Sequence, residues 1–521
     1  MRAGTATKIL CAAAVMVVGV LWAGPLGANG DGLVEAAKKR DGAAVTALLK
    51  QAVDVNGAQP DGATALHWAA HWDDVAMADR LLRAGAQVNV ANEYGVTPLF
   101  LACSDGGAAM VGRLLKAGAN PNVALPNGET PLMTAARTGK VEAVKALLAR
   151  GADVQAKETI KGQTGLMWAI AERHGAVAAT LVEHGADVKA RSANGATPLL
   201  FAARAGDREL ARLLLEHGAD VNEADATGTS VLLMATVRGH VELAEYLLEQ
   251  GANPNADAAG YTALHWAAGK WETEFTTDYS FAPGTTEEWA AVAGVPSGKH
   301  TLIKSLITHG ANVNARLMKA PPQSSRTGTR YDVMRGGTPF YLAAFAGDAS
   351  TMRVLLDLGA DSRATANDKT TPLMVAAGLA HHENRSRVTE PSFLESVKLL
   401  VNLGADVNAV NAEGWTALHA ATLAGHQTVA QFLLDHGAQL NAKTKYGQTA
   451  LGIAEGYCPL VEADGRIQPR PACIIGYRPQ MAAYLRTLGA ASEGKVALDF
   501  SGVLIVSGSS APAGAAAATK P

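Results

Sequence analysis

The stretch Thr262-Ala263-Leu264-His265-Trp266-Ala267-Ala268 recurs along this chain in closely related forms, and this recurrence decides the fold. Near-copies begin at Thr64 and Thr416, and a threonine, once a serine, opens a similar pattern at eleven positions. These positions are 64, 97, 130, 164, 197, 230, 262, 338, 371, 416 and 449, and most neighbouring pairs are equally spaced, as 64, 97 and 130 are. A fixed period in the thirties predicts a solenoid of stacked helical units rather than one closed core.

Each unit also carries local signals for the start and the end of its helices. The threonine offers an oxygen to the unpaired N–H groups of the first helical turn, and a proline after it lacks an N–H that would be unpaired anyway. Eleven glycines follow the second helix of a unit, where a residue with positive φ is expected to end it. They are Gly85, Gly118, Gly151, Gly185, Gly218, Gly251, Gly310, Gly359, Gly404, Gly437 and Gly489.

These segments resemble the Thr-Pro-Leu-His helix opening of the ankyrin-repeat family. Thr64-Ala65-Leu66-His67 and Thr416-Ala417-Leu418-His419 keep the histidine, and Thr130-Pro131-Leu132 keeps the proline. A Gly-Ala-Asp-Val-Asn segment typical of the same repeats recurs at 218–222 and 404–408. The resemblance covers roughly residues 31 to 490. It implies an all-α fold with short β-hairpins, an ankyrin-repeat α-solenoid of about twelve repeats.

Two columns of the repeat hold histidines and tryptophans that could be mistaken for a ligand site. His67, His265 and His419 share their column with Met133, Leu200 and other apolar residues. The next column holds Trp68, Trp168 and Trp266, again alternating with Leu, Phe, Met and Val. A position that accepts Met and Leu is a packing position, so we expect both columns to be structural. The alternatives are metal ligands and an aromatic ligand box.

The N-terminal segment, 1–28, is typical of a secretory signal peptide. Arg2 and Lys8 precede an apolar run over residues 9–23, and small residues follow it up to Ala28. We expect cleavage after Ala28, with Ala23 as the alternative site, and therefore an exported protein that is periplasmic or secreted. No stable membrane span is expected after cleavage. An uncleaved N-terminal anchor is the other interpretation.

Export affects the interpretation of the cysteines. Cys458 and Cys473 lie in one irregular segment, and in an oxidising compartment a disulfide between them would stabilise the fold by roughly 3 kcal/mol. Two free thiols are the alternative. Cys103 replaces the second alanine of the Ala-Ala pair, so we expect a small buried side chain.

Bulk composition and motifs restrict the function classes. A net charge of −3 over 521 residues gives no electrostatic reason to expect nucleic-acid binding. The chain shows no Ser-His-Asp set, no His-Glu-x-x-His and no phosphate-binding glycine loop, so we expect no enzyme activity, no cofactor and no metal. We expect a monomer.

Four insertions interrupt the repeat, near residues 272–298, 317–335, 380–391 and 457–477. The span from the opening threonine to the terminal glycine is longer than usual in the repeats of Thr262, Thr371 and Thr449, which end at Gly310, Gly404 and Gly489. These three insertions are expected between the two helices of a repeat. The first is acidic and aromatic and contains no Lys or Arg, and it either recognises a ligand or packs on its own repeat. The insertion near 380–391 contains His381-His382-Glu383, which is weak evidence for a metal, and a solvated loop is the other interpretation.

The remaining insertion lengthens a hairpin and is basic. In the proteins that this chain resembles, hairpin tips and inner helices line the concave binding face, and we expect this face to bind a partner here. Aromatic residues beside other hairpin glycines suit interface anchors. The candidate protein-binding residues are Tyr94, Tyr261, Trp415, Tyr446, Arg326, Arg330 and Arg335. We expect these side chains to be largely exposed on a non-catalytic scaffold for protein–protein interaction. The alternative function is small-ligand or glycan binding, or accessory enzyme activity, on the insertions.

The C-terminal segment, 491–521, differs from the repeats. A short apolar stretch within 496–506 is expected to form a strand or to cover the last repeat. The final residues are rich in Ala, Ser, Gly and Pro, a composition typical of a disordered tail.

Overall fold

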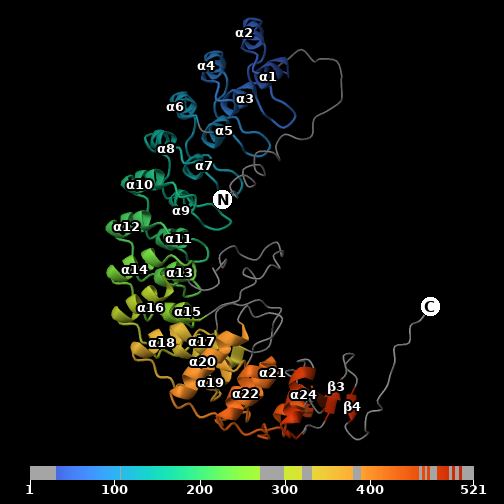
Figure 1. Cartoon of the computed structure of the whole chain (residues 1–521). Coiled ribbons are helices and arrows are strands. Elements are labelled where there is room, and N and C mark those ends of the chain that lie inside the picture. Colours follow the sequence, from blue (N-terminus) through green and yellow to red (C-terminus); the bar gives the residue numbers. More distant parts are fainter. Residues whose placement is uncertain are drawn as a thin grey trace, which may run out of the picture. The chain divides into compact units, whose positions relative to one another are not determined.

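The computed structural model describes residues 31–105, 107–269, 298–319, 331–379, 389–456, 460–463, 466–469, 478–491, 496–498 and 504–506. The chain divides into two compact units, Met1–Asp187 and Val188–Pro521. Within each unit, pairs of short helices stack so that first helices form one row and second helices another (Figure 1). Their described parts contain twelve helix pairs, in agreement with the predicted number of repeats.

The unit Met1–Asp187 contains five of these pairs in its described residues. The first helices are α1 (Asp31–Lys38), α3 (Ala65–His71), α5 (Pro98–Asp105), α7 (Pro131–Thr138) and α9 (Gly165–Ala171). The second helices are α2 (Gly42–Lys50), α4 (Val75–Arg83), α6 (Ala108–Lys116), α8 (Val141–Leu148) and α10 (Gly175–Glu183). Each first helix contacts its second helix and the neighbouring first helices.

The unit Val188–Pro521 contains the other seven pairs. Its first helices are α11 (Pro198–Ala205), α13 (Val231–Val237), α15 (Ala263–Ala268), α17 (Pro339–Phe345), α19 (Pro372–Ala376), α21 (Ala417–Ala424) and α23 (Ala450–Ala454). Its second helices are α12 (Arg208–Glu216), α14 (Val241–Glu249), α16 (Lys299–Thr308), α18 (Ala349–Asp357), α20 (Glu390–Asn402), α22 (Gln427–Asp435) and α24 (Pro479–Thr487). A 3-10 helix, η4 (Tyr331–Met334), precedes α17.

The predicted helix signals are confirmed. Thr130 precedes α7 with extended backbone, and its side chain accepts a hydrogen bond from the Met133 amide at 3.3 Å. Ser230 does the same for the Leu233 amide at the start of α13. All eleven predicted glycines after the second helices have positive φ, for example 87° at Gly251. Local sequence therefore determines where these short helices begin and end.

The hydrophobic core lies along the first helices. Every residue of α13 and of α21 is buried, because each first helix is enclosed by its own second helix and by its two neighbours. A second helix buries only one face, as Leu210, Ala211 and Leu214 show in α12. Stability therefore accumulates by burial of apolar surface between adjacent repeats.

Asparagines join successive repeats at the end of the second helices. Asn222 donates from its side-chain amide to the Gly251 carbonyl at 3.3 Å and accepts from the Asn253 amide at 2.6 Å. The last residue of the recurring Gly-Ala-Asp-Val-Asn segment is thus a link to the next repeat. Equivalent paired bonds are made by Asn56, Asn89, Asn122, Asn255, Asn314 and Asn408.

The predicted β-hairpins are turns rather than paired strands in the described repeats. Isolated bridges join Ala58 to Thr64, Lys157 to Thr164 and Ala224 to Ser230. Strands occur instead outside the repeat pattern: β1 (Leu460–Ala463) pairs antiparallel with β2 (Arg466–Pro469). β3 (Val496–Leu498) pairs antiparallel with β4 (Leu504–Val506), which confirms the prediction of a strand in this stretch.

The helix bounds confirm where three insertions lie. They fall between α15 and α16, between α19 and α20, and between α23 and α24, each time between the two helices of one repeat. Most of their residues, including His381, Cys458 and Cys473, lie outside the described residues. Cys103 is buried in α5 with a free thiol, as expected, and burial raises the pKa of that thiol.

Candidate protein-binding face

The turns before the first helices, called tips below, hydrogen-bond to each other from repeat to repeat. In the unit Met1–Asp187, the Glu93 amide donates to the Asp61 carbonyl at 2.8 Å. In the unit Val188–Pro521, the Ala226 amide donates to the Asn194 carbonyl at 3.0 Å. This backbone bonding holds neighbouring tips and the adjoining ends of the first helices close together. Within a unit, it creates one continuous candidate face of tips and first helices.

Three buried histidines hydrogen-bond the start of a first helix to the backbone of the following repeat. The Thr262 amide donates to His265 Nδ1 at 3.2 Å, and His265 Nε2 lies 3.0 Å from the Ala315 carbonyl of the following repeat. The carbonyl can only accept, so Nε2 carries the proton and Nδ1 is the acceptor. His67 and His419 repeat this arrangement with the Val96 and Ala442 carbonyls.

The environment of these histidines favours the neutral ring. Burial lowers the pKa of His265 and of His419 to about 4, and it lowers the pKa of His67 in the same direction. A protonated ring would also have no acceptor for the threonine amide. The prediction that the column of His67, His265 and His419 is structural is confirmed. These histidines also form a polar link to the next repeat, which Met or Leu in the same column cannot make.

An aromatic cluster lies at the first two helix pairs of the unit Met1–Asp187. The Trp68 and Trp72 rings stack with centroids 6.3 Å apart, and His71 lies 4.5 Å from Trp72. Lys38 Nζ lies over Trp68 at 5.3 Å, and the Arg40 guanidinium lies over Trp72 at 5.7 Å. Trp68 is buried, as expected for its column, whereas Trp72 is 37% exposed. Trp72 is therefore an anchor candidate that the sequence reasoning missed.

Two large side chains project from the tips of the same unit. Tyr94 is 47% exposed, as predicted, and Ile160 is 71% exposed. Ile160 occupies an unusually long tip, because Thr164 follows Thr130 by one position more than the common spacing of the repeats. The buried Glu158 carboxylate holds this turn by accepting from the amides of Ile160 and Gln163 at 2.7 and 2.8 Å. The longer spacing between Thr130 and Thr164 is the sequence signal from which this unusual tip could have been predicted.

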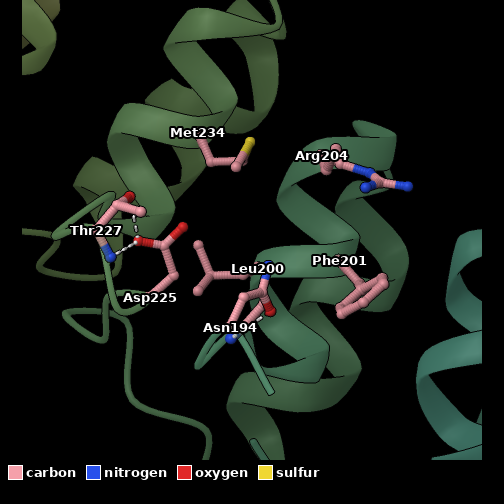
Figure 2. Close-up of a pocket in the computed structure, with 8 residues that line it drawn as sticks. Asn194, Leu200, Phe201, Arg204, Asp225, Thr227 and Met234 are labelled. Atoms are coloured by element: carbon pink, nitrogen blue, oxygen red, sulfur yellow. Dashed lines mark hydrogen bonds between the residues drawn. The ribbon is translucent and has the colours of Figure 1, made fainter. Parts of the chain in front are cut away.

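A pocket of about 70 Å³ opens on the candidate face of the unit Val188–Pro521 (Figure 2). It lies between two adjacent repeats, with α11 and its tip on one side and α13 and its tip on the other. The lining residues are Asn194, Ala196, Leu200, Phe201, Arg204, Asp225, Thr227 and Met234. From the sequence, Leu200 was expected in a packing column, and no pocket was predicted here, because the pocket exists only once two repeats are stacked.

The expectation that Tyr261 is exposed is wrong, since only 2% of this residue is accessible. Its ring packs against Trp266 with centroids 6.1 Å apart. The Met318 and Lys319 amides of the lengthened hairpin both donate to the Gly260 carbonyl, which brings this hairpin against the tip. Tyr261 is therefore a core residue and no longer a candidate contact.

The other predicted residues are only partly described. Trp415 is half-buried against His419, with ring centroids 5.9 Å apart, and Tyr446 is half-buried under Lys445 Nζ at 5.6 Å. Arg335 is exposed on a tip. Arg326 and Arg330 lie outside the described residues. The structure thus places Tyr94 on a tip of the unit Met1–Asp187, and Arg335, Trp415 and Tyr446 on tips of the unit Val188–Pro521. The tips of Trp415 and Tyr446 are adjacent, because the Lys445 amide donates to the Glu413 carbonyl at 2.8 Å.

The described parts of the chain hold neither a metal-ligand cluster nor a membrane-spanning helix. No group of three or more His, Cys, Asp or Glu side chains is placed there to hold a metal ion. The helices in those parts are each too short or too polar to cross a membrane.

One known protein family matches most of the chain. The family "Ankyrin repeats (3 copies)" matches residues 33–124, 108–192, 157–225, 199–275 and 388–463. Together these segments cover more than half of the 521 residues. Among solved structures, the human ASB11 ankyrin repeat domain aligns at 32% identity and a TM-score of 0.39, over 43% of this chain and 98% of that domain.

Curated relatives share short stretches with the chain. Notch-regulated ankyrin repeat-containing protein A of Danio rerio is 46% identical over 57 residues, which are 11% of this chain and 45% of that protein. A homolog of transient receptor potential cation channel subfamily A member 1 in Caenorhabditis elegans is 30% identical over 119 residues, 23% of this chain and 9% of that protein. The chain therefore spans less than half the length of these relatives.

Proposed function

Because the chain belongs to the ankyrin-repeat family, whose repeats generally mediate protein–protein interaction, we propose that it is a non-catalytic scaffold that binds a partner protein. The binding surface is the candidate face of tips and first helices. The single observation that carries this proposal is the exposure of large apolar side chains on tips that are otherwise small or polar. Tyr94 and Ile160 are the clearest cases.

The tips and first helices are better suited to partner binding than the second helices are. Second helices expose mainly charged side chains that pair locally, such as Arg212 with Glu209 and Glu216. Such exposed pairs contribute little to binding. Aromatic residues on well-supported turns lose little conformational freedom on binding and commonly act as hot spots. The tip residues combine this chemistry with a backbone held by repeat-to-repeat hydrogen bonds.

Tyr94→Ala and Trp415→Ala are expected to weaken partner binding, by roughly 1 to 3 kcal/mol where the residue is a hot spot. Tyr94→Ala should leave the melting temperature nearly unchanged, because 47% of the residue is exposed. Binding can be measured by capture of the partner from extract on the immobilised full chain, followed by titration of the purified partner. Arg353→Ala, on the exposed face of α18, is the matched control. Equal binding by all variants would contradict the proposal.

We also propose that the protein is exported, on the basis of the charged start, apolar run and small residues of segment 1–28. The mature chain should then begin near Asn29 and fractionate outside the cytoplasm. N-terminal sequencing of the protein purified from its natural source tests this. Recovery of intact Met1 on cytoplasmic protein would contradict it, and would also remove the basis for the Cys458–Cys473 disulfide.

A further inference from the structure

The pocket between α11 and α13 has apolar walls. Leu200, Phe201 and Met234 form them, and all three side chains are buried. Figure 2 shows Leu200 between the two first helices, with Met234 on the neighbouring repeat. The volume of about 70 Å³ accommodates part of one unbranched aliphatic chain. These walls therefore favour an occupant with a narrow apolar stem.

At the tip end of this pocket, Asp225 presents one carboxylate oxygen as an open acceptor. Its Oδ1 accepts from the amide and the hydroxyl of Thr227 at 2.9 and 2.7 Å, and from the Thr229 amide at 3.0 Å. Among the described residues, no group donates to its Oδ2, and no Lys or Arg forms an ion pair with it. In Figure 2 the dashed lines reach one Asp225 oxygen, while the other points toward Leu200 and Met234.

The other end of the pocket is positive, and this sets the direction of a bound cation. The Arg204 guanidinium lies over the Phe201 ring at 5.6 Å, at the end of α11. Figure 2 shows this guanidinium directed away from Asp225. A cation in the pocket is attracted by Asp225 and repelled by Arg204. Its charge therefore belongs at the tips, and its apolar stem belongs between the first helices.

The open oxygen of Asp225 distinguishes between the two basic side chains of proteins. Arginine makes its most specific carboxylate contact through two parallel hydrogen bonds to two oxygens. At Asp225 only Oδ2 is open, because Oδ1 already accepts from Thr227 and Thr229. Lysine instead carries a compact ammonium on an unbranched stem, and such stems lie along apolar surfaces while the charge stays at the polar edge. The pocket thus matches lysine better than arginine.

We propose that the pocket binds a lysine side chain on the surface of the partner protein. The stem inserts between Leu200 and Met234, and the ammonium donates to Asp225 Oδ2. This inference rests on the proposed function, because the partner protein supplies the lysine. It adds one specific contact on the candidate face, which recognises a lysine by its stem and its charge together.

The test begins with a selection of phage-displayed random peptides on the purified full chain, with counter-selection against the Asp225→Asn variant. Enriched peptides should share a lysine. Fluorescence anisotropy then measures the affinity of the best peptide. Replacing its lysine by norleucine keeps an aliphatic stem, removes the charge and should weaken binding about tenfold, the size expected for a hydrogen bond between charged groups. Replacing it by arginine should also weaken binding, because only one carboxylate oxygen is open.

Asp225→Asn removes the charge of the pocket and preserves the turn. Asn92 and Asn411 occupy the equivalent position in two other tips and accept from the corresponding two amides. This variant should bind the lysine peptide about tenfold more weakly. Asp368→Asn is the matched control, because Asp368 is a half-buried tip carboxylate of the same unit that does not line the pocket. It should bind normally.

Two further arms separate the charge from the apolar contact. Ala196→Leu fills the pocket, and the fold tolerates large residues at this position, since other repeats carry Val96, Tyr261 and Trp415 there. It should weaken binding of the lysine peptide and of the norleucine peptide by a similar factor. Asp225→Asn should add little further loss for the norleucine peptide, as expected for two groups that contact each other.

Several results would overturn the proposal. They are enriched peptides without a shared lysine, unchanged affinity of the norleucine peptide, and an equal loss for Asp368→Asn. Acidic peptides that lose affinity for Arg204→Gln would assign the pocket to an anion. Self-association that Asp225→Asn abolishes would assign it to a second copy of the chain. If Tyr94→Ala weakens binding of the natural partner and Asp225→Asn does not, the proposed function survives while this inference fails.

Discussion

Gly228→Ala is expected to destabilise its repeat by several kcal/mol. Gly228 has a φ of 84°, and an alanine Cβ there would lie 2.4 Å from the Ala258 carbonyl carbon of the next tip. A left-handed alanine costs about 1 to 2 kcal/mol, and overpacking against backbone adds about 1 to 3 kcal/mol. Denaturant unfolding would measure the total loss in the free energy of unfolding. Hydrogen exchange would show that the loss is concentrated in the neighbouring repeats.

Gly251→Ala is the matched control for this experiment. Gly251 has nearly the same φ, 87°, but an added Cβ would meet no atom within 4 Å. It should therefore show only the backbone cost of about 1 to 2 kcal/mol. The difference between the two variants measures the contact between adjacent tips. Equal destabilisation by both variants would mean that the tips are not packed as described.

The second large effect concerns pH. Burial places the pKa of His265 near 4 in the folded chain, below the value of about 6.5 expected for an unfolded histidine. The unfolded chain thus binds the proton more readily than the folded chain does. The contribution of neutral His265 to the free energy of unfolding is therefore complete above about pH 6.5, and it is lost as the pH falls toward 4. The slope is about 1.4 kcal/mol per pH unit. His419 should contribute in the same direction.

His265→Met isolates this contribution, because Met occupies the same column in other repeats. At neutral pH the variant should be less stable by roughly 1 to 3 kcal/mol, since the Thr262 amide and the Ala315 carbonyl lose their partner. Between pH 6.5 and 5, however, it should lose about 2 kcal/mol less than the wild type. Chemical denaturation at a series of pH values measures both effects, with the exposed His217→Gln as control. Parallel pH curves for wild type and His265→Met would refute the assigned role.

Features that depend on one repeat could be predicted from the sequence. The threonine caps, the glycines at helix ends and the number of helix pairs all follow from short-range signals, and all were found. The packing columns were predictable for the same reason, since alternation of His or Trp with Met and Leu reveals a buried position.

Features that depend on two repeats could not be predicted in this way. Tyr261 resembles Tyr94 in sequence, but the following hairpin covers its tip, so the two aromatic residues have opposite exposures. The inter-repeat bonds of Asn222 and His265 and the pocket beside Arg204 also arise only when neighbours stack. The candidate face was therefore predicted in outline, while its individual contacts required the structure.

The proposed function places partner binding on the tips and first helices. Its most direct test is photo-crosslinking of the full chain in native extract, with a photoreactive residue at Tyr94, Ala226 or Trp415 on tips, or at Glu209 or Arg353 on second helices. We expect the same partner to be crosslinked from the tip positions and not from the second helices. Crosslinks formed from Glu209 and Arg353 but not from the tips would contradict the claim.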